Sequence, residues 1–214
     1  MPSAESASEH LRTIRSLMER ATVYRAVSGP GALAGGGLAL AIGGTLLAKE
    51  TSWQPSNLEF AGIWVAALVV VGLFNFYLLY RGSKNRAEPF VSSGMKHALR
   101  AISPPLFAGF VLSMILATSG VGAASGAKAE MAALWTLFYG LSLLAAGAFA
   151  PRSMVVLGIA CSLMGLSLFL PAVQASASED YGLALRTMIG CFGVLHLLYG
   201  AYVMLSSKRA PRFS

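Results

Sequence analysis

Long apolar segments alternate with short polar ones along most of the chain. Six apolar runs can be delimited, at residues 31–48, 60–80, 101–119, 131–150, 154–173 and 183–205. A helix needs about 20 residues to cross the roughly 30 Å of hydrocarbon in a bilayer. None of the runs has the alternating pattern of transmembrane β-strands, so their backbone amides must be satisfied within helices. The pattern predicts an all-α protein with a bundle of six transmembrane helices over residues 28–206.

Composition supports this prediction by arguing against a soluble protein. Of the 214 residues, 56% are hydrophobic and 12% are charged, and the mean hydropathy is +0.65. Soluble domains carry about 25% charged residues. The segments between the runs are too short for a separate soluble domain. Any chemistry is therefore expected inside the bilayer or at its two faces.

The basic residues indicate the orientation. Thirteen of the 16 Lys and Arg residues fall on one side of the predicted spans, and only Lys49, Lys128 and Arg186 fall on the other. Positively charged loops stay in the cytoplasm, so we expect a multi-pass protein of the plasma (inner) membrane with both termini cytoplasmic. The net charge of +7 then follows from topology, and no nucleic-acid binding is expected. A signal peptide is the alternative for 31–48, but its polar lead is too long.

The N-terminal arm has a different pattern. Residues 1–7 are small and polar and are expected to be disordered, and a capping box at Ser6 and Glu9 predicts a helix over 8–27. This helix is amphipathic and basic, so we expect it to lie on anionic lipid headgroups, although docking onto a protein partner is the alternative. The tail at 207–214 is basic and cytoplasmic. The predicted headgroup-binding residues are Arg12, Arg15, Arg20, Arg25, Lys96 and Arg100.

Short phrases recur before and within the spans. The letters RAVSGP at 25–30 return as RAISPP at 100–105, Pro151 precedes the fifth span, and Tyr-Gly occurs at 139–140 and 199–200. A cation, a capping serine and a proline are typical of a helix start at the cytoplasmic interface. The echoes favour three parallel two-helix repeats. Mitochondrial carriers have a similar layout, but their acidic position after each proline holds Ala32, Phe107 and Ser153 here.

The first span is rich in small residues. Gly31, Gly35, Ala39 and Gly43 recur every four residues, and such a stripe lets a neighbouring helix approach closely. Packing is the favoured interpretation, and a passage lined by glycine is the alternative. Trp64 is expected to anchor the second span at the outer interface.

One ionisable residue lies near the middle of a span. His196 falls about the midplane of the sixth run, and intramembrane ionisable groups are candidates for function. It could hydrogen-bond to Asn75, Tyr139, Ser142 or Ser162 and hold helices together, or it could carry a proton or contact a ligand. We favour the structural role. The candidate polar site comprises His196, Asn75, Tyr139 and Tyr199.

Several chemistries are not expected. A bis-His haem site needs a second intramembrane histidine, and the only others are His10 and His97. No zinc, nucleotide or phosphate motif is present, and the spans hold no acidic residue for ion coupling. Cys161 and Cys191 are expected about 10 Å from the inner face and about 12 Å from the outer face, too far apart for a disulfide.

Two functions remain. The first is a non-enzymatic membrane protein with a binding, scaffold or regulatory role, which binds a partner, a lipid or another small apolar molecule. The second is a small transporter or channel with its site near the midplane, around His196 and Asn75. A membrane enzyme ranks below both because the spans hold few catalytic groups. No cofactor and no metal are expected.

Overall fold

The computed structural model describes residues 29–85, 93–118, 127–147, 150–170 and 180–209. Every regular element in these ranges is a helix, which confirms the all-α prediction for them. The helices are α2 (Gly29–Ala48), α3 (Asn57–Asn85), α4 (Ser93–Thr118), α5 (Lys128–Ala145), α6 (Arg152–Ser167), α8 (Asp180–Met188), the π-helix η1 (Ile189–Leu195) and α9 (His196–Arg209). The predicted arm helix over 8–27, its four arginines and the end of the tail lie outside the described residues.

Among the described residues, four helices are long and apolar enough to cross a membrane. They cover Gly29–Ala48, Asn57–Asn85, Met95–Thr118 and Tyr181–Ser206. The last is one continuous helix made of α8, η1 and α9. The apolar helix α6 has 16 residues, which corresponds to about 24 Å. The protein therefore has the character of a membrane protein, and the count of six spans stays a prediction.

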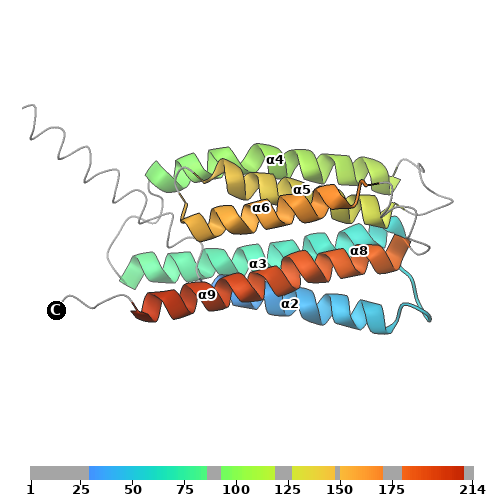
Figure 1. Cartoon of the computed structure of the whole chain (residues 1–214), viewed down its shortest axis with the longest axis horizontal. Helices are drawn as coiled ribbons and strands as arrows, with labels where there is room; N and C mark the ends of the chain where they lie inside the picture. Colours follow the sequence, from blue (N-terminus) through green and yellow to red (C-terminus); the bar gives the residue numbers. More distant parts are fainter. Residues whose placement is uncertain (1–28, 86–92, 119–126, 148–149, 171–179, 210–214) are drawn as a thin grey trace, which may run out of the picture.

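The helices run along one common direction in two groups of three (Figure 1). One group holds α4, α5 and α6, with α5 packed on both neighbours; the other holds α2, α3 and the helix from α8 to α9. Helix α2 packs mainly on η1 and α9 and less on α3, its partner in the predicted first hairpin. The first and last helices of the described chain thus lie side by side, and the three-hairpin repeat is not confirmed.

The starts of three helices can be compared with the sequence predictions. A capping box begins α3, because the Ser56 amide donates to Glu59 Oε2 at 2.7 Å and the Glu59 amide donates to Ser56 Oγ at 3.2 Å. Pro151 is the N-cap of α6, with φ of −64°. Pro104 and Pro105, in contrast, do not open a helix.

Both prolines lie inside α4, which begins at Ser93. The prediction that the letters RAISPP mark the start of a helix was therefore wrong. A proline removes the amide that would bond to the carbonyl four residues earlier. For Pro104 that carbonyl belongs to Arg100, and the Ser103 hydroxyl lies 3.5 Å from it. A side chain thus approaches the carbonyl that the proline leaves without its usual partner.

Small residues set the closest helix contacts. In α2, a Cβ added at Gly36 would lie 2.9 Å from the Gly193 carbonyl oxygen, and one at Gly29 would lie 3.1 Å from that of Gly200. In α6, a Cβ at Gly165 would lie 2.5 Å from the Leu137 amide nitrogen. Two interfaces therefore bring backbones into close contact, which only glycine permits. One joins α2 to η1 and α9, and the other joins α5 to α6.

Helix α3 is packed over only a small part of its length. Its buried residues, Phe60, Ala61 and Trp64, all fall within its first eight positions. Beyond them the large side chains of Leu68, Val69, Val70, Leu73 and Phe76 are exposed. A continuous exposed apolar face on a 29-residue helix fits contact with lipid tails. The helix is thus fixed to the bundle at one end.

Candidate binding site

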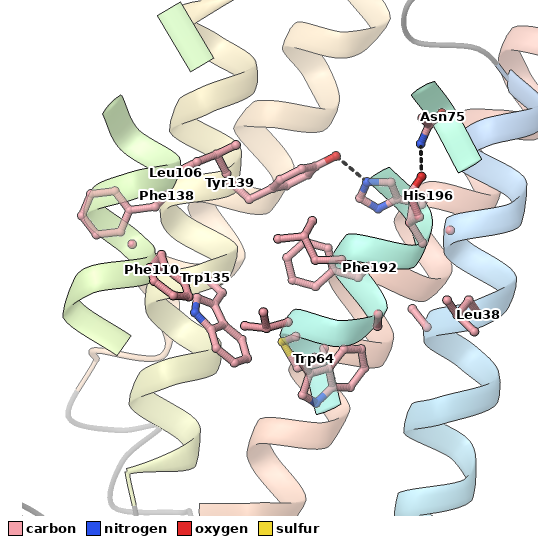
Figure 2. Close-up of a pocket in the computed structure, with 18 of the residues that line it drawn as sticks. Leu38, Trp64, Asn75, Leu106, Phe110, Trp135, Phe138, Tyr139, Phe192 and His196 are labelled. Carbon is pink, nitrogen blue, oxygen red and sulfur yellow. Dashed lines mark hydrogen bonds between the residues drawn. The ribbon is translucent and has the colours of Figure 1, made fainter. Parts of the chain in front are cut away.

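A cavity of about 230 Å³ lies between the two groups of helices. It is lined by residues of α2, α3, α4 and α5 and of the long helix that contains η1. Figure 2 shows the side chains around it, with Tyr139, His196 and Asn75 towards one end and Trp64 and Trp135 towards the other. No Asp, Glu, Lys or Arg is among the described residues that line it. The cavity is therefore apolar, with a small neutral polar end.

Two hydrogen bonds fix the orientation of His196. Its Nδ1 lies 2.8 Å from the Cys191 carbonyl oxygen, and its Nε2 lies 2.7 Å from the Tyr139 hydroxyl. A carbonyl oxygen only accepts, so Nδ1 carries the hydrogen. In the neutral ring Nε2 then accepts from the Tyr139 O–H. The predicted partner set of His196 thus reduces to Tyr139, and this pair links α5 to α9.

Aromatic rings surround the same pair. The Phe192 ring lies 5.2 Å from the Tyr139 ring and 5.9 Å from the His196 ring, measured between centroids. Tyr139 and His196 have centroids 5.3 Å apart. These distances fall in the range where aromatic pairs attract each other. The polar end of the cavity is thus held by ring contacts as well as by hydrogen bonds.

Asn75 lines the cavity but does not bond to His196. Its side-chain amide donates to the Val71 carbonyl oxygen of its own helix at 3.1 Å. This bond uses one of the two amide hydrogens and leaves the side-chain oxygen as an acceptor. The predicted hydrogen bond between Asn75 and His196, which would have linked two helices, is therefore not formed. Its remaining polar capacity lies at the polar end of the cavity.

The small residues of α2 divide between two faces. Gly31, Gly35 and Ala39 line the cavity. Gly43 instead packs against Ile189. The stripe that packs on η1 and α9 is Gly29, Gly36 and Gly43, with a spacing of seven residues. A Cβ added at Gly35 would lie 3.1 Å from Val71 Cγ1, so this glycine lets α3 approach α2 closely.

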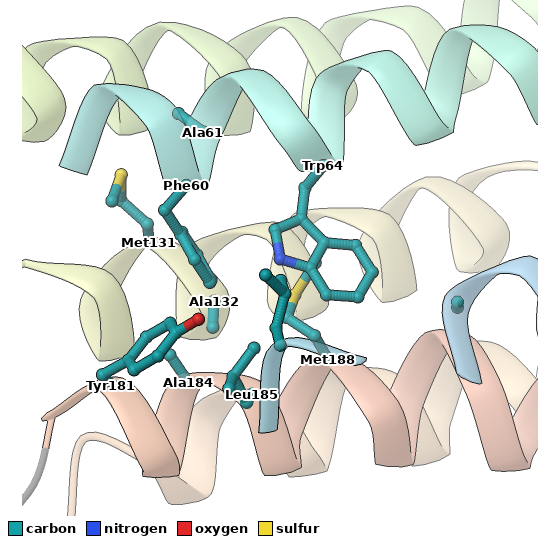
Figure 3. Close-up of a cluster of buried hydrophobic side chains, with 11 residues drawn as sticks. Phe60, Ala61, Trp64, Met131, Ala132, Tyr181, Ala184, Leu185 and Met188 are labelled. Atoms are coloured by element: carbon teal, nitrogen blue, oxygen red, sulfur yellow. The ribbon is translucent and has the colours of Figure 1, made fainter. Parts of the chain in front are cut away.

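The other end of the cavity is closed by a buried aromatic cluster (Figure 3). Phe60 is fully buried and stacks on Trp135, with centroids 6.0 Å apart and planes 5° from parallel. Trp64 and Tyr181 meet the same ring edge-on at 6.3 Å. Trp64 is only 5% exposed, so its predicted role as an interface anchor was wrong. Its indole N–H has no acceptor among the described residues.

Part of the lining is exposed towards the outside of the bundle. Leu68 of α3 is 59% exposed and Phe110 of α4 is 43% exposed, yet both line the cavity. Residues that border a cavity and also face outwards mark an opening. The cavity therefore opens sideways between α3 and α4, where a transmembrane protein meets lipid tails. An apolar molecule dissolved in the bilayer could enter without crossing water.

Tyr199 does not join the cavity. It belongs to a second buried cluster with Leu143, Met154 and Leu157. Tyr199 lies about one helical turn beyond His196, and there it packs with residues of α5 and α6. Of the four predicted site residues, three therefore line one cavity and one packs in the core. The remaining headgroup candidates, Lys96 and Arg100, are exposed on α4.

The predicted separation of the two cysteines was also wrong. Cys161 of α6 and Cys191 of η1 are fully buried, and their sulfur atoms lie 3.2 Å apart as free thiols. Counting from the ends of the apolar runs assumed that both spans fill the same membrane thickness. Helix α6 is short and begins at Arg152, whereas the last helix extends over 180–209. The two cysteines therefore lie at the same level along the bundle, and not at the two different depths that the count predicted.

Comparisons with known proteins add no assignment. No protein-family model, curated protein or solved structure matches this chain. Among the described residues, no group of three or more His, Cys, Asp or Glu side chains is placed to hold a metal ion.

Proposed function

We propose that this is a non-enzymatic integral membrane protein that binds a small, mainly apolar molecule in the cavity between its helices. The observation that carries the proposal is the cavity itself, lined by five helical segments and polar only around His196, Tyr139 and Asn75. Ligand sites in proteins are concave and apolar, with a few placed polar groups that orient the ligand. The lining fits this description.

The ligand is expected to enter from the bilayer and to orient by its polar end. The sideways opening between α3 and α4 supports entry from lipid. The Asn75 amide offers an acceptor and a donor, and the Tyr139 oxygen keeps lone pairs after donating to His196. A ligand with one hydroxyl or carbonyl group at the end of an apolar body matches these groups. The aromatic cluster would then contact the apolar body.

We place the bundle in the plasma (inner) membrane as six spans with both termini cytoplasmic. The four long apolar helices support the membrane location, and the distribution of basic residues supports the orientation. A reporter fused after Ser214 should give a cytoplasmic signal. A periplasmic signal would contradict the orientation.

Tryptophan quenching tests the binding proposal. Trp64 and Trp135 line the cavity, whereas Trp53 is 43% exposed outside it. In a Trp53→Phe background, bromobenzene should quench the two remaining indoles in a saturable way, because the heavy atom is held at a finite site. Ala67→Phe, which fills the lining, should remove the saturable part, and Ala66→Phe, exposed and outside the lining, should keep it. Linear quenching in all three proteins would refute a site.

A small transporter or channel is the second candidate. It is favoured by the fact that one cavity reaches both His196 and Asn75, the residues on which the hypothesis rests. The apolar lining supports binding more than ion passage, because ions need polar groups along their path. A His196→Ala variant that folds and keeps the protein's normal cellular role would exclude a transporter that depends on this residue.

The N-terminal arm is proposed to bind anionic headgroups through Arg12, Arg15, Arg20 and Arg25. Each cation near an anionic surface contributes about 1 kcal/mol. The peptide 1–27 should bind vesicles that contain phosphatidylglycerol, and salt should weaken the binding. Equal binding to neutral vesicles would contradict the role of the arginines, and absence of binding to both kinds of vesicle would favour the alternative, in which the arm docks onto a protein partner.

A further inference from the structure

The contact between Cys161 and Cys191 is not used by the proposed binding function. The chain has two cysteines, and the fold brings both sulfur atoms to 3.2 Å from helices that are 30 residues apart in sequence. Neither residue lines the cavity, so the pair lies on a different face of η1. The sulfur atoms would need to approach by about 1.2 Å to reach the bond length of a disulfide. Small side-chain rotations are expected to provide such a movement.

Cys191 has a second connection, through its backbone. Its carbonyl oxygen accepts the Nδ1 hydrogen of His196 at 2.8 Å, while its thiol points to Cys161. The residue lies in the π-helix η1, between Gly190 and Gly193. π-Helical turns are rare within helices and occur frequently at functional sites. One residue thus carries both the thiol that meets Cys161 and the carbonyl that orients His196.

We propose that Cys161 and Cys191 form a reversible dithiol–disulfide site that links α6 to η1 and controls the orientation of His196. The oxidant is a lipid-soluble hydroperoxide. One thiol transfers its sulfur electron pair to the peroxide oxygen, which breaks the O–O bond and yields a sulfenic acid and an alcohol. The second thiol then attacks the sulfenic sulfur, and the S–O bond breaks with release of water. Two thiols and one hydroperoxide thus give one disulfide, one alcohol and one water. A small uncharged dithiol reverses the change by thiol–disulfide exchange: it gives two electrons and two hydrogens to the Cys161–Cys191 disulfide, and it is itself oxidised to a disulfide.

The location of the pair limits which oxidants can react. Both residues are fully buried, so an oxidant reaches the thiols only when the helices open locally. An uncharged oxidant dissolved in the bilayer is then favoured, because a charged oxidant would have to leave water to enter this apolar environment. The proposal does not depend on the nature of any cavity ligand, because the thiols lie outside the cavity lining.

The first test measures the bond itself. The full-length protein in lipid nanodiscs is treated with cumene hydroperoxide, denatured, reacted with a maleimide reagent and analysed by intact mass spectrometry. The wild type should lose two hydrogen atoms and fail to react with maleimide until dithiothreitol restores both thiols. Two reactive thiols after treatment, or covalent dimers in place of the internal bond, would overturn the proposal.

A matched variant keeps two thiols but moves one of them. In the double variant Cys161→Ser and Ser162→Cys, the thiol rotates by about 100° around α6, towards Gly140 and away from Cys191. This variant should stay reduced under the same treatment. Cys161→Ser and Cys191→Ser, each tested for folding by size-exclusion chromatography, should form no internal bond. A disulfide in the displaced double variant would mean that proximity at 161 is not the cause, and the proposal would fail.

The second test reads the connection to His196. With ¹⁵N-labelled histidine, the His196 ring signals are identified by their loss in His196→Gln. Oxidation of the wild type should shift these signals, and dithiothreitol should reverse the shift. In Cys161→Ser the same oxidant should leave them in place. Unchanged His196 signals in wild-type protein whose disulfide has formed would overturn the proposed control of His196.

Discussion

Gly165→Ala tests whether the backbone contact between α5 and α6 stabilises the fold. A Cβ at this position would lie 2.5 Å from the Leu137 amide nitrogen, 2.7 Å from the Ala133 carbonyl oxygen and 2.9 Å from the Leu137 Cα. Ordinary contact begins at 3.4 Å. All three neighbours are backbone atoms of one helix, so none can rotate away. The helices must separate by up to about 0.9 Å to admit the methyl group.

The size of the effect follows from that separation. A gap of 0.5–1 Å removes about a quarter to a half of the dispersion energy of each contact pair across an interface. Overpacking of this kind costs about 1–3 kcal/mol. Replacing glycine by alanine within a helix returns up to about 1 kcal/mol. We therefore expect Gly165→Ala to lower the free energy of unfolding by about 1–2 kcal/mol.

The assay and its control use the same helix chemistry. Reversible unfolding in mixed micelles, with the mole fraction of sodium dodecyl sulfate as denaturant, gives the free energy of unfolding. Gly37→Ala is the matched control, because a Cβ at Gly37 meets nothing within 4 Å. It should be neutral or stabilising by up to about 1 kcal/mol. Equal effects of the two substitutions would refute the packing argument.

Three further predictions address other contacts. Tyr139→Phe removes the hydrogen bond to His196 and should lower the free energy of unfolding by about 0.6–1.7 kcal/mol in the same assay; no change would mean that the pair is not formed in the membrane. Ser56→Ala removes a capping box and should cost about 1 kcal/mol, with amide exchange faster only in the first turn of α3. Phe60→Ala should cost about 3–5 kcal/mol because the ring is fully buried, while Phe107→Ala, 69% exposed, should cost much less.

The sequence predicted the helical class and the approximate helices well because both depend on local composition. The runs at 31–48 and 183–205 fall within α2 and within the helix from α8 to α9. The sequence around Pro104 and Pro105 has the letters of a helix start, and the prediction relied on those letters. The preceding residues 93–103 are already helical, so the helix begins earlier. Only the chain before the motif distinguishes the two cases.

The candidate site was predicted in part. His196 and Tyr139 could be proposed because an imidazole in a span needs a partner, and the structure brings them together at 2.7 Å. Trp64 was assigned to the membrane interface from its position near a span's end, yet it is buried in the aromatic cluster. The contact of Cys161 with Cys191 was excluded by counting residues from the ends of the runs. The offset between two helices of unequal length decides that contact.

The apolar runs along the chain determine which segments form helices suited to a bilayer. Their length and the hydrogen bonding of the backbone within each helix are local requirements. The sequence also places the small residues of α2 in a stripe. Tertiary structure alone decides which neighbouring helix each small residue meets. Gly36 meets η1 and Gly35 faces α3, although they are neighbours in sequence, because successive residues of a helix point about 100° apart. The cavity and the cysteine pair both follow from the way those faces meet.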